Sequence, residues 1–217
     1  MLIDFSDIAA SFPVSFLDQV SGLVSAADQA GSDSLAPSLE GLPSPEVFRV
    51  DPQPKTLCPN LEQLLSDSFG QLEQGRDIHF YSFGNFNLVR LLMHLLRQTG
   101  PAHLFMTSYS FSMRSIEQLQ NRLETRQLLS FRLIVDHRVK SMSPKPFQML
   151  STAFNYRCLP IHAKVALLWN QQWRLSVITS QNATDNPKME RGVIQTDPAV
   201  FDFDLKILEN AFERGTT

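Results

Sequence analysis

Hydrophobic and polar positions alternate beyond residue 76 in a way that predicts strands and helices in turn. In chain order the patterns are strand 77–83, helix 85–98, strand 102–111, helix 112–127, strand 131–135 and helix 146–154. An apolar hairpin follows, with strands 165–169 and 173–179 around a polar turn at 170–172, and then a strand at 191–195 and a helix at 199–214. Ser112 is the expected N-cap of its helix. This alternation predicts an α/β fold, with a mixed, mainly parallel sheet flanked by helices on both faces.

The first part of the chain has a different pattern. Residues 3–24 carry apolar side chains at intervals of three and four, interrupted near Pro13, which predicts an amphipathic helix. Residues 31–59 are rich in Ser, Pro, Gly and Asp, the composition of a linker. We therefore expect an N-terminal helical arm at 1–30, a linker at 31–59 and one domain at 60–217. The arm can pack on its own domain or dock on a partner subunit, and the sequence favours neither.

Composition narrows the class of protein without identifying it. The chain has 217 residues, 43% hydrophobic and 19% charged, which suits one globular domain with an appendage. Its net charge of −3 gives no overall basic field, so any binding of nucleic acid must come from local patches. Cys58 and Cys158 form no metal-ligand spacing. The start Met-Leu-Ile-Asp lacks the positive charge of a secretory signal, and we expect a cytoplasmic protein without membrane association.

Four residues with useful chemistry flank the predicted hairpin. His162 and Lys164 precede its first strand, and Ser180 and Asn182 follow its second strand. A short turn brings all four to the same end of the sheet. An imidazole, an ammonium, a hydroxyl and an amide are the groups that can hold a phosphate diester and attack it.

Each of these residues also has an ordinary structural explanation. His162 can be a core histidine at a strand start, and Asn182 can be a turn residue. Lys164 stands in an apolar stretch, where a charge needs a partner. Glu190, further along a polar loop, is equally well read as a surface acid. Alone, therefore, none of them identifies a site.

The order His162-x-Lys164, Ser180-x-Asn182 and then Glu190 resembles the phospholipase D superfamily, within it the small members that carry one copy of the motif. No internal repeat is visible. Two positions depart from the family pattern: Trp169 stands where an Asp usually follows the Lys by five residues, and Thr179 stands where a Gly usually precedes the Ser. The spacing from His162 to Ser180 is also slightly longer than usual.

The resemblance implies a role for each motif residue. His162 would attack phosphorus and form a phosphohistidine intermediate, while Lys164 and Asn182 would hold the non-bridging oxygens. Ser180 would hydrogen-bond within the site, and Glu190 would accept from the far nitrogen of His162 and fix its tautomer. No metal and no cofactor is implied.

A single motif lacks the general acid that must protonate the leaving oxygen. A two-fold homodimer supplies it, because the His162 side chains of two subunits would then face each other across one phosphate. The resemblance to small single-motif members implies the same homodimer.

We therefore expect a metal-independent phosphodiesterase, a DNA endonuclease. The alternative is a catalytically weak or inactive module that binds phosphate or nucleic acid in a larger assembly, and phospholipid hydrolysis ranks last. Candidate substrate contacts are Lys188 and Arg191 beside Glu190, and Ser108 and Tyr109 at the end of strand 102–111. The loop 136–138, Asp-His-Arg, forms a local basic patch with the nearby Lys140 and Lys145, which can guide a polyanion or simply be solvated.

Overall fold

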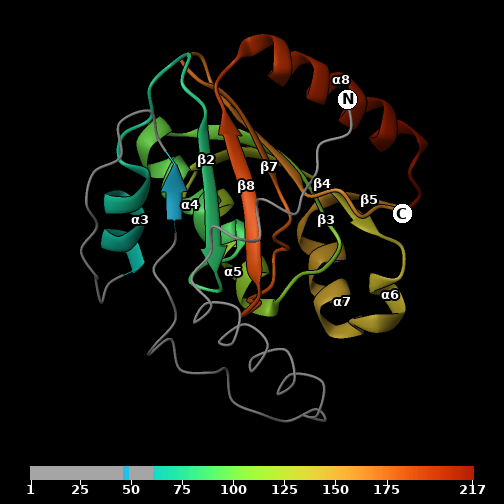
Figure 1. Cartoon of the computed structure of the whole chain (residues 1–217). Coiled ribbons are helices and arrows are strands. Elements are labelled where there is room, and N and C mark those ends of the chain that lie inside the picture. Colours follow the sequence, from blue (N-terminus) through green and yellow to red (C-terminus); the bar gives the residue numbers. More distant parts are fainter. Residues whose placement is uncertain (1–45, 49–60) are drawn as a thin grey trace, which may run out of the picture. The chain divides into compact units, whose positions relative to one another are not determined.

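The computed structural model describes residues 46–48 and 61–217 (Figure 1). The expected arm at 1–30 lies outside these residues, as does the expected linker at 31–59 apart from one short strand. In chain order the described elements are β1 (Glu46–Phe48), α3 (Leu61–Phe69), β2 (Ile78–Phe83), α4 (Leu88–Thr99), β3 (Ala102–Ser108), α5 (Met113–Glu124), β4 (Leu128–Asp136), α6 (Val139–Met142), α7 (Pro144–Ala153), β5 (Asn155–Leu159), β6 (Val165–Trp169), β7 (Arg174–Thr179), β8 (Met189–Gln195) and α8 (Pro198–Arg214).

The strands form one mixed sheet in the order β1-β2-β8-β7-β6-β3-β4-β5. The predicted mixed, mainly parallel sheet is confirmed in the direction of its strands, since β2, β7, β3, β4 and β5 all run the same way. Parallel neighbours occur only at β3–β4 and β4–β5, where helices make the crossovers. The other pairs of neighbours are antiparallel, because β6 and β8 are inserted between strands of the main direction and the edge strand β1 runs opposite to β2.

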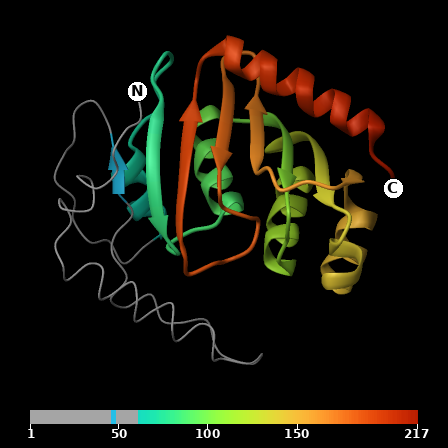
Figure 2. The same ribbon diagram turned by 45° about the vertical axis from the view of Figure 1, so that its right-hand side comes forward.

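Helices cover both faces of the sheet, as predicted. Leu104 and Met106 of β3 pack in the core that includes α4 and α5. Phe105, between them, points to the other face, where it packs in a second core with Phe201 and Phe212 of α8. Figure 2 shows α8, in red, on the opposite side of the sheet from the green helices. In the described ranges, no helix is both long enough and apolar enough to cross a membrane.

Local interactions fix the hairpin and the helix starts. Asn170 accepts hydrogen bonds from the backbone N–H groups of Gln172 and Trp173, which closes the turn between β6 and β7 where the sequence predicts it. Ser112 caps α5 by accepting from the N–H of Ser115, which confirms its predicted role. The segments before β6 and after β7 therefore meet at one end of the sheet.

Gly192 of β8 allows a close approach between two neighbouring strands. It pairs with Phe80 of β2, and a Cβ at position 192 would lie 2.7 Å from Cε1 of the Phe80 ring. Phe80 is 1% exposed and packs edge-on against Phe69, with ring centroids 5.3 Å apart. A side chain at 192 must therefore displace a ring that is held on its other side.

We predict that Gly192→Ala lowers the free energy of unfolding by about 1–3 kcal/mol, because overpacking forces the Phe80 ring from its place. Urea denaturation followed by circular dichroism measures the loss. In the double variant with Phe80→Leu the two losses should be less than additive. Strict additivity would show that the clash with Phe80 is not the cause.

Candidate active site

Lys164 and His162 converge at the start of the hairpin, although not as neighbours on one face of a strand, which their spacing of two residues predicts. Residues 161–164 are irregular, so the two side chains do not share one face of a strand. Instead the Lys164 side chain turns back, and its Nζ donates to the His162 carbonyl at 2.7 Å and lies 3.2 Å from Nδ1 of the same residue. The Lys164 carbonyl accepts from the N–H of Thr179 at 3.0 Å, which links this segment to the end of β7.

Burial differs sharply between the two groups. The His162 side chain is exposed, whereas Lys164 is 6% exposed. Burial lowers the pKa of Lys164, and the negative charge of Glu190 opposes part of that shift. A fixed cation thus lies under an accessible imidazole, in surroundings where its charge is poorly screened.

Tyr109 stands beside both groups. Its ring centroid is 5.6 Å from that of His162 and 5.9 Å from Nζ of Lys164. On another side, the Arg138 guanidinium carbon lies 4.8 Å from the Tyr109 ring. Tyr109, a candidate substrate contact from the sequence, is therefore brought to the site. Arg138 comes with it from the loop after β4.

Two buried side chains hold the backbone on either side of His162. Asp136, 1% exposed, accepts from the N–H of Ile161 at 3.1 Å and from Nε of Arg138 at 2.8 Å. Thr107 donates to the carbonyl of Ala163 at 2.8 Å and accepts from the N–H of Val165 at 3.0 Å. The irregular segment that carries His162 is therefore fixed by strands β4 and β3.

Asn182 lies in a loop joined to the end of β3. Its Oδ1 accepts from the Tyr109 N–H at 3.3 Å, and within the described ranges its Nδ2 has no hydrogen-bond partner. Ser108, expected to contact substrate, is fully buried; it donates to the Ser110 carbonyl and accepts from the Ala183 N–H at 3.1 Å. Ser108 thus holds the loop, and Asn182 keeps one amide donor to offer.

Glu190 is engaged by neighbours other than His162. Its carboxylate accepts from the Ser180 hydroxyl and from Nδ2 of Asn186, the latter at 2.8 Å. No hydrogen bond joins Glu190 to His162 in the part of the chain that the structure describes, so the expected contact is not made. Gly84 lets the Asn186 loop approach, since it has φ +82° and a Cβ there would lie 2.7 Å from Cα of Pro187.

The structure places the candidate substrate contacts Lys188 and Arg191 on different sides of β8 and its loop. Lys188 is exposed in the same loop as Asn186, which accepts from its N–H at 3.1 Å. Arg191 follows Glu190 in β8 and so points to the other face of the sheet, where it approaches His79 and Tyr81 of β2. The structure separates Arg191 from His162 because adjacent residues of a strand face opposite ways.

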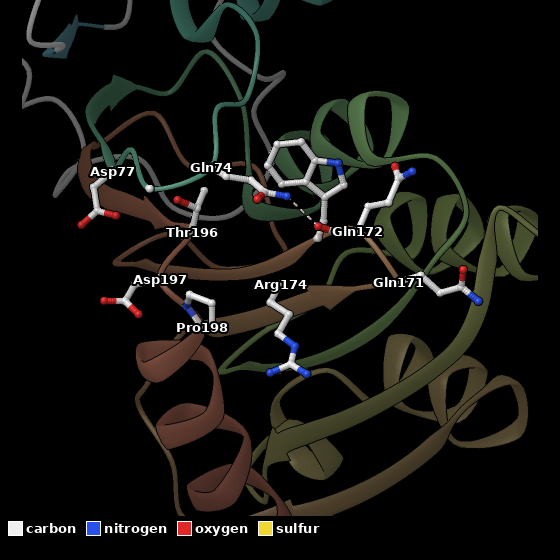
Figure 3. A pocket seen from close by; sticks show the side chains of 10 residues that line it. Gln74, Asp77, Gln171, Gln172, Arg174, Thr196, Asp197 and Pro198 are labelled. Atoms are coloured by element: carbon white, nitrogen blue, oxygen red, sulfur yellow. Dashed lines mark hydrogen bonds between the residues drawn. The ribbon is translucent and has the colours of Figure 1, made fainter.

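A cavity of about 510 Å³ lies at the opposite end of the hairpin, beside the turn between β6 and β7 (Figure 3). Gln74, Trp173 and Asp197 are among the residues that line it, and Gln74 donates to the Gln172 carbonyl at 2.9 Å. It contains none of the predicted site residues. Neither there nor in the rest of the described ranges is there a group of three His, Cys, Asp or Glu side chains that could hold a metal ion.

Among known proteins, only solved structures match this chain. No family model and no curated protein sequence matches the chain. The polyphosphate kinase of Porphyromonas gingivalis superposes with a TM-score of 0.50 at 13% identity, over 65% of this chain and 26% of that one. NucT of Helicobacter pylori has a TM-score of 0.49 at 14% identity, over 65% and 99% of the two chains. Nuc of Salmonella typhimurium, a phospholipase D family member, has a TM-score of 0.47 at 16% identity, over 58% and 88%.

The chain therefore shares its fold with the matching part of the polyphosphate kinase. At these identities the similarity concerns the fold alone. The chain also spans only about a quarter of the kinase's length.

The position at which the family pattern usually has an Asp lies far from His162 in this structure. Trp169, which takes its place, is the last residue of β6, about 16 Å along the strand from Lys164. Its ring stacks on His103, with centroids 5.3 Å apart, and packs edge-on against Phe201 of α8. Trp169 fills the core at the far end of the hairpin, so its presence takes no group away from His162.

Asp136 is the residue of this candidate site that the sequence least reveals, since its loop was interpreted as a local basic patch. Burial alone would raise its pKa, but hydrogen bonds from the side chain and backbone of Arg138 and from the Ile161 N–H, with the Arg138 charge, lower it to about 2. The carboxylate stays ionised and acts through the backbone it holds. The sequence signal that could have identified Asp136 is an acid directly after a predicted strand and two residues before an Arg.

We predict that Asp136→Asn lowers the free energy of unfolding at pH 7 by about 2 kcal/mol, the size of a charged hydrogen-bond network. Because the pKa is about 2 when folded and 3.8 ordinarily, this contribution is complete above pH 4 and is lost as the pH falls towards 2. Urea titrations between pH 2 and pH 7 should therefore show a shallower acid limb for the variant.

Asp202→Asn is the matched control, because Asp202 forms an exposed ion pair with Arg174 and should contribute little. Equal losses and equal acid limbs for the two variants would contradict the role of Asp136.

Proposed function

We propose that this protein is a metal-independent phosphodiesterase, a DNA endonuclease, that works through a phosphohistidine at His162 in a site completed by a second copy of the chain. The observation that carries the proposal is the exposed His162 ring with the buried Lys164 ammonium against it. The unused Nδ2 of Asn182 adds an amide donor from the neighbouring loop. Both donors suit the non-bridging oxygens of a phosphate diester.

The reaction has two displacements. A ring nitrogen of His162 attacks phosphorus, the P–N bond forms, and the bond from phosphorus to the leaving oxygen breaks as that oxygen takes a proton. Water then attacks phosphorus, and the P–N bond breaks to release the imidazole. Lys164 and Nδ2 of Asn182 donate to the oxygens that carry the charge in both transition states.

The first step needs a general acid opposite the attacking ring. Among the described residues, no second histidine contacts His162, whose ring is open to solvent. An exposed nucleophile is accessible to a two-fold partner, and His162 of the partner subunit then protonates the leaving oxygen. In the second step the same group takes the proton from water.

Nucleic acid is the substrate class that the resemblance to small single-motif members supports. The resemblance to the phospholipase D superfamily as a whole agrees with phosphodiester chemistry in general. The chain's net charge of −3 requires that any contact with a polyanion be local.

One observation favours a second candidate function, a binding module with little or no turnover. Glu190 is occupied by Ser180 and Asn186, so it does not orient the His162 ring in this arrangement. In that case Lys164 and Asn182 still bind a phosphate, but the attacking nitrogen is not held in one tautomer.

We predict that the purified chain cuts plasmid DNA in excess EDTA, and that His162→Ala lowers the rate about a thousandfold or more by removing the nucleophile. A gel assay of supercoiled plasmid measures both. His137→Ala is the matched control, because His137 is also exposed and follows Asp136 directly. Binding without cutting would favour the module, and cutting by His162→Ala would exclude the mechanism.

We also predict a mass in solution of about twice 24.6 kDa, measured by light scattering. Because each site needs two chains, the specific activity should fall on dilution below the dimer dissociation constant. A fully active monomer would show that one chain supplies both the nucleophile and the acid.

A further inference from the structure

A groove of about 710 Å³ runs between α3, α4 and α5 and is lined by four arginines. Arg90 and Arg97 belong to α4, and Arg114 and Arg122 belong to α5. Glu62 and Glu117 line it as well, so the groove has an excess of two positive charges. On a chain with a net charge of −3, this is a local concentration of positive charge.

The arginines form one row on each helix. Arg114 and Arg122 are eight residues apart on α5 with Gln118 midway, so all three lie on the same stripe of the helix. Arg90, Met93 and Arg97 form the equivalent stripe on α4. At 1.5 Å per residue, the rows extend over about 10 Å on α4 and about 12 Å on α5.

Both helices start at the loop that carries Asn182. The N–H of Leu88, the first residue of α4, donates to the Asn182 carbonyl, and the N–H of Ser112, the cap of α5, donates to the Ala183 carbonyl. α4 packs beside α5, and both run away from this loop in the same direction (Figure 2). The groove therefore begins at a site loop and leads away from it.

Two members of the groove lack strong protein partners. Arg114 has no hydrogen bond or ion pair within the described ranges, and Arg122 bonds only to the neutral amide of Gln127. Oε1 of Gln118 is buried without a hydrogen-bond partner among the described residues. By contrast, Arg97 pairs with Glu62 at 2.9 Å, and Arg90 pairs with Asp185 at 3.4 Å. The donors on α5 are thus the ones available to an anionic ligand.

We propose that this groove binds the sugar-phosphate backbone of one nucleic-acid strand next to the scissile phosphate. The proposal rests on the proposed function only for the identity of the substrate. Guanidinium groups match phosphate oxygens in geometry as well as in charge. The two rows therefore offer guanidinium groups to successive phosphates of one strand. The strand that leaves the site at Asn182 enters the groove between Arg90 and Arg114.

The test measures binding of a fluorescein-labelled 20-nucleotide single strand by anisotropy, over a series of salt concentrations. The full chain is used, with His162→Ala in every sample so that affinity is read without cutting. The test variant carries Arg114→Gln and Arg122→Gln. The matched control carries Lys206→Gln and Arg214→Gln, two exposed cations of α8, on the other face of the sheet.

We expect the groove variant to bind about tenfold more weakly at 100 mM salt and to lose roughly 1.4 from the slope of log K against log salt. The control should keep both the affinity and the slope. Equal losses in the two variants would reduce the effect to overall charge and overturn the proposal. So would an unchanged groove variant, or no binding of the oligonucleotide by the parent chain.

This outcome is independent of turnover. If the chain with His162 intact does not cut DNA but the groove variant still loses affinity, the proposed function fails and the groove proposal stands. If the chain cuts DNA and the groove variant binds normally, the reverse holds.

Discussion

The burial of one ammonium group against an imidazole is the constraint on which the candidate site depends. A charged lysine is stable at this depth only when neighbouring dipoles and charges compensate for lost hydration. Here the carbonyl of His162 and the nearby carboxylate of Glu190 do so, and that carboxylate is held by Ser180 and Asn186. The chain around Lys164 therefore has little freedom, and the ring beside it is presented to solvent in a defined position.

The rest of the structure maintains that arrangement from several distant segments. β3 supplies Thr107, β4 supplies Asp136, and the hairpin brings the Asn182 loop to the same end of the sheet. Each of these side chains bonds to backbone. A site built this way depends on sheet register more than on local sequence, because one step along a strand would turn every such side chain to the other face.

Sequence pattern predicted the features that depend on local periodicity. The hairpin, the Ser112 cap and the mixed α/β sheet follow from patterns within short windows. The meeting of His162 with Lys164 was also predicted, but it comes from the turned-back Lys164 side chain and not from a shared strand face. The sequence pattern did not predict β5 or α3. β5 is a short edge strand with one buried residue, which gives no alternation to detect, and α3 follows the Pro-rich segment. The sequence pattern also did not predict contacts between segments that are distant in the sequence. Glu190 bonds to Ser180 and not to His162, and Arg191 faces away, because both outcomes depend on how β8 pairs with β2 and β7.

Because the pKa of Asp136 is depressed, the backbone that it holds responds to pH in a different range from the candidate site residues. A carboxylate that protonates only near pH 2 keeps its hydrogen bonds to the backbone over the whole pH range in which histidine side chains ordinarily titrate. A change in the rate of the proposed reaction between mildly acidic and alkaline solution would therefore not come from protonation of Asp136.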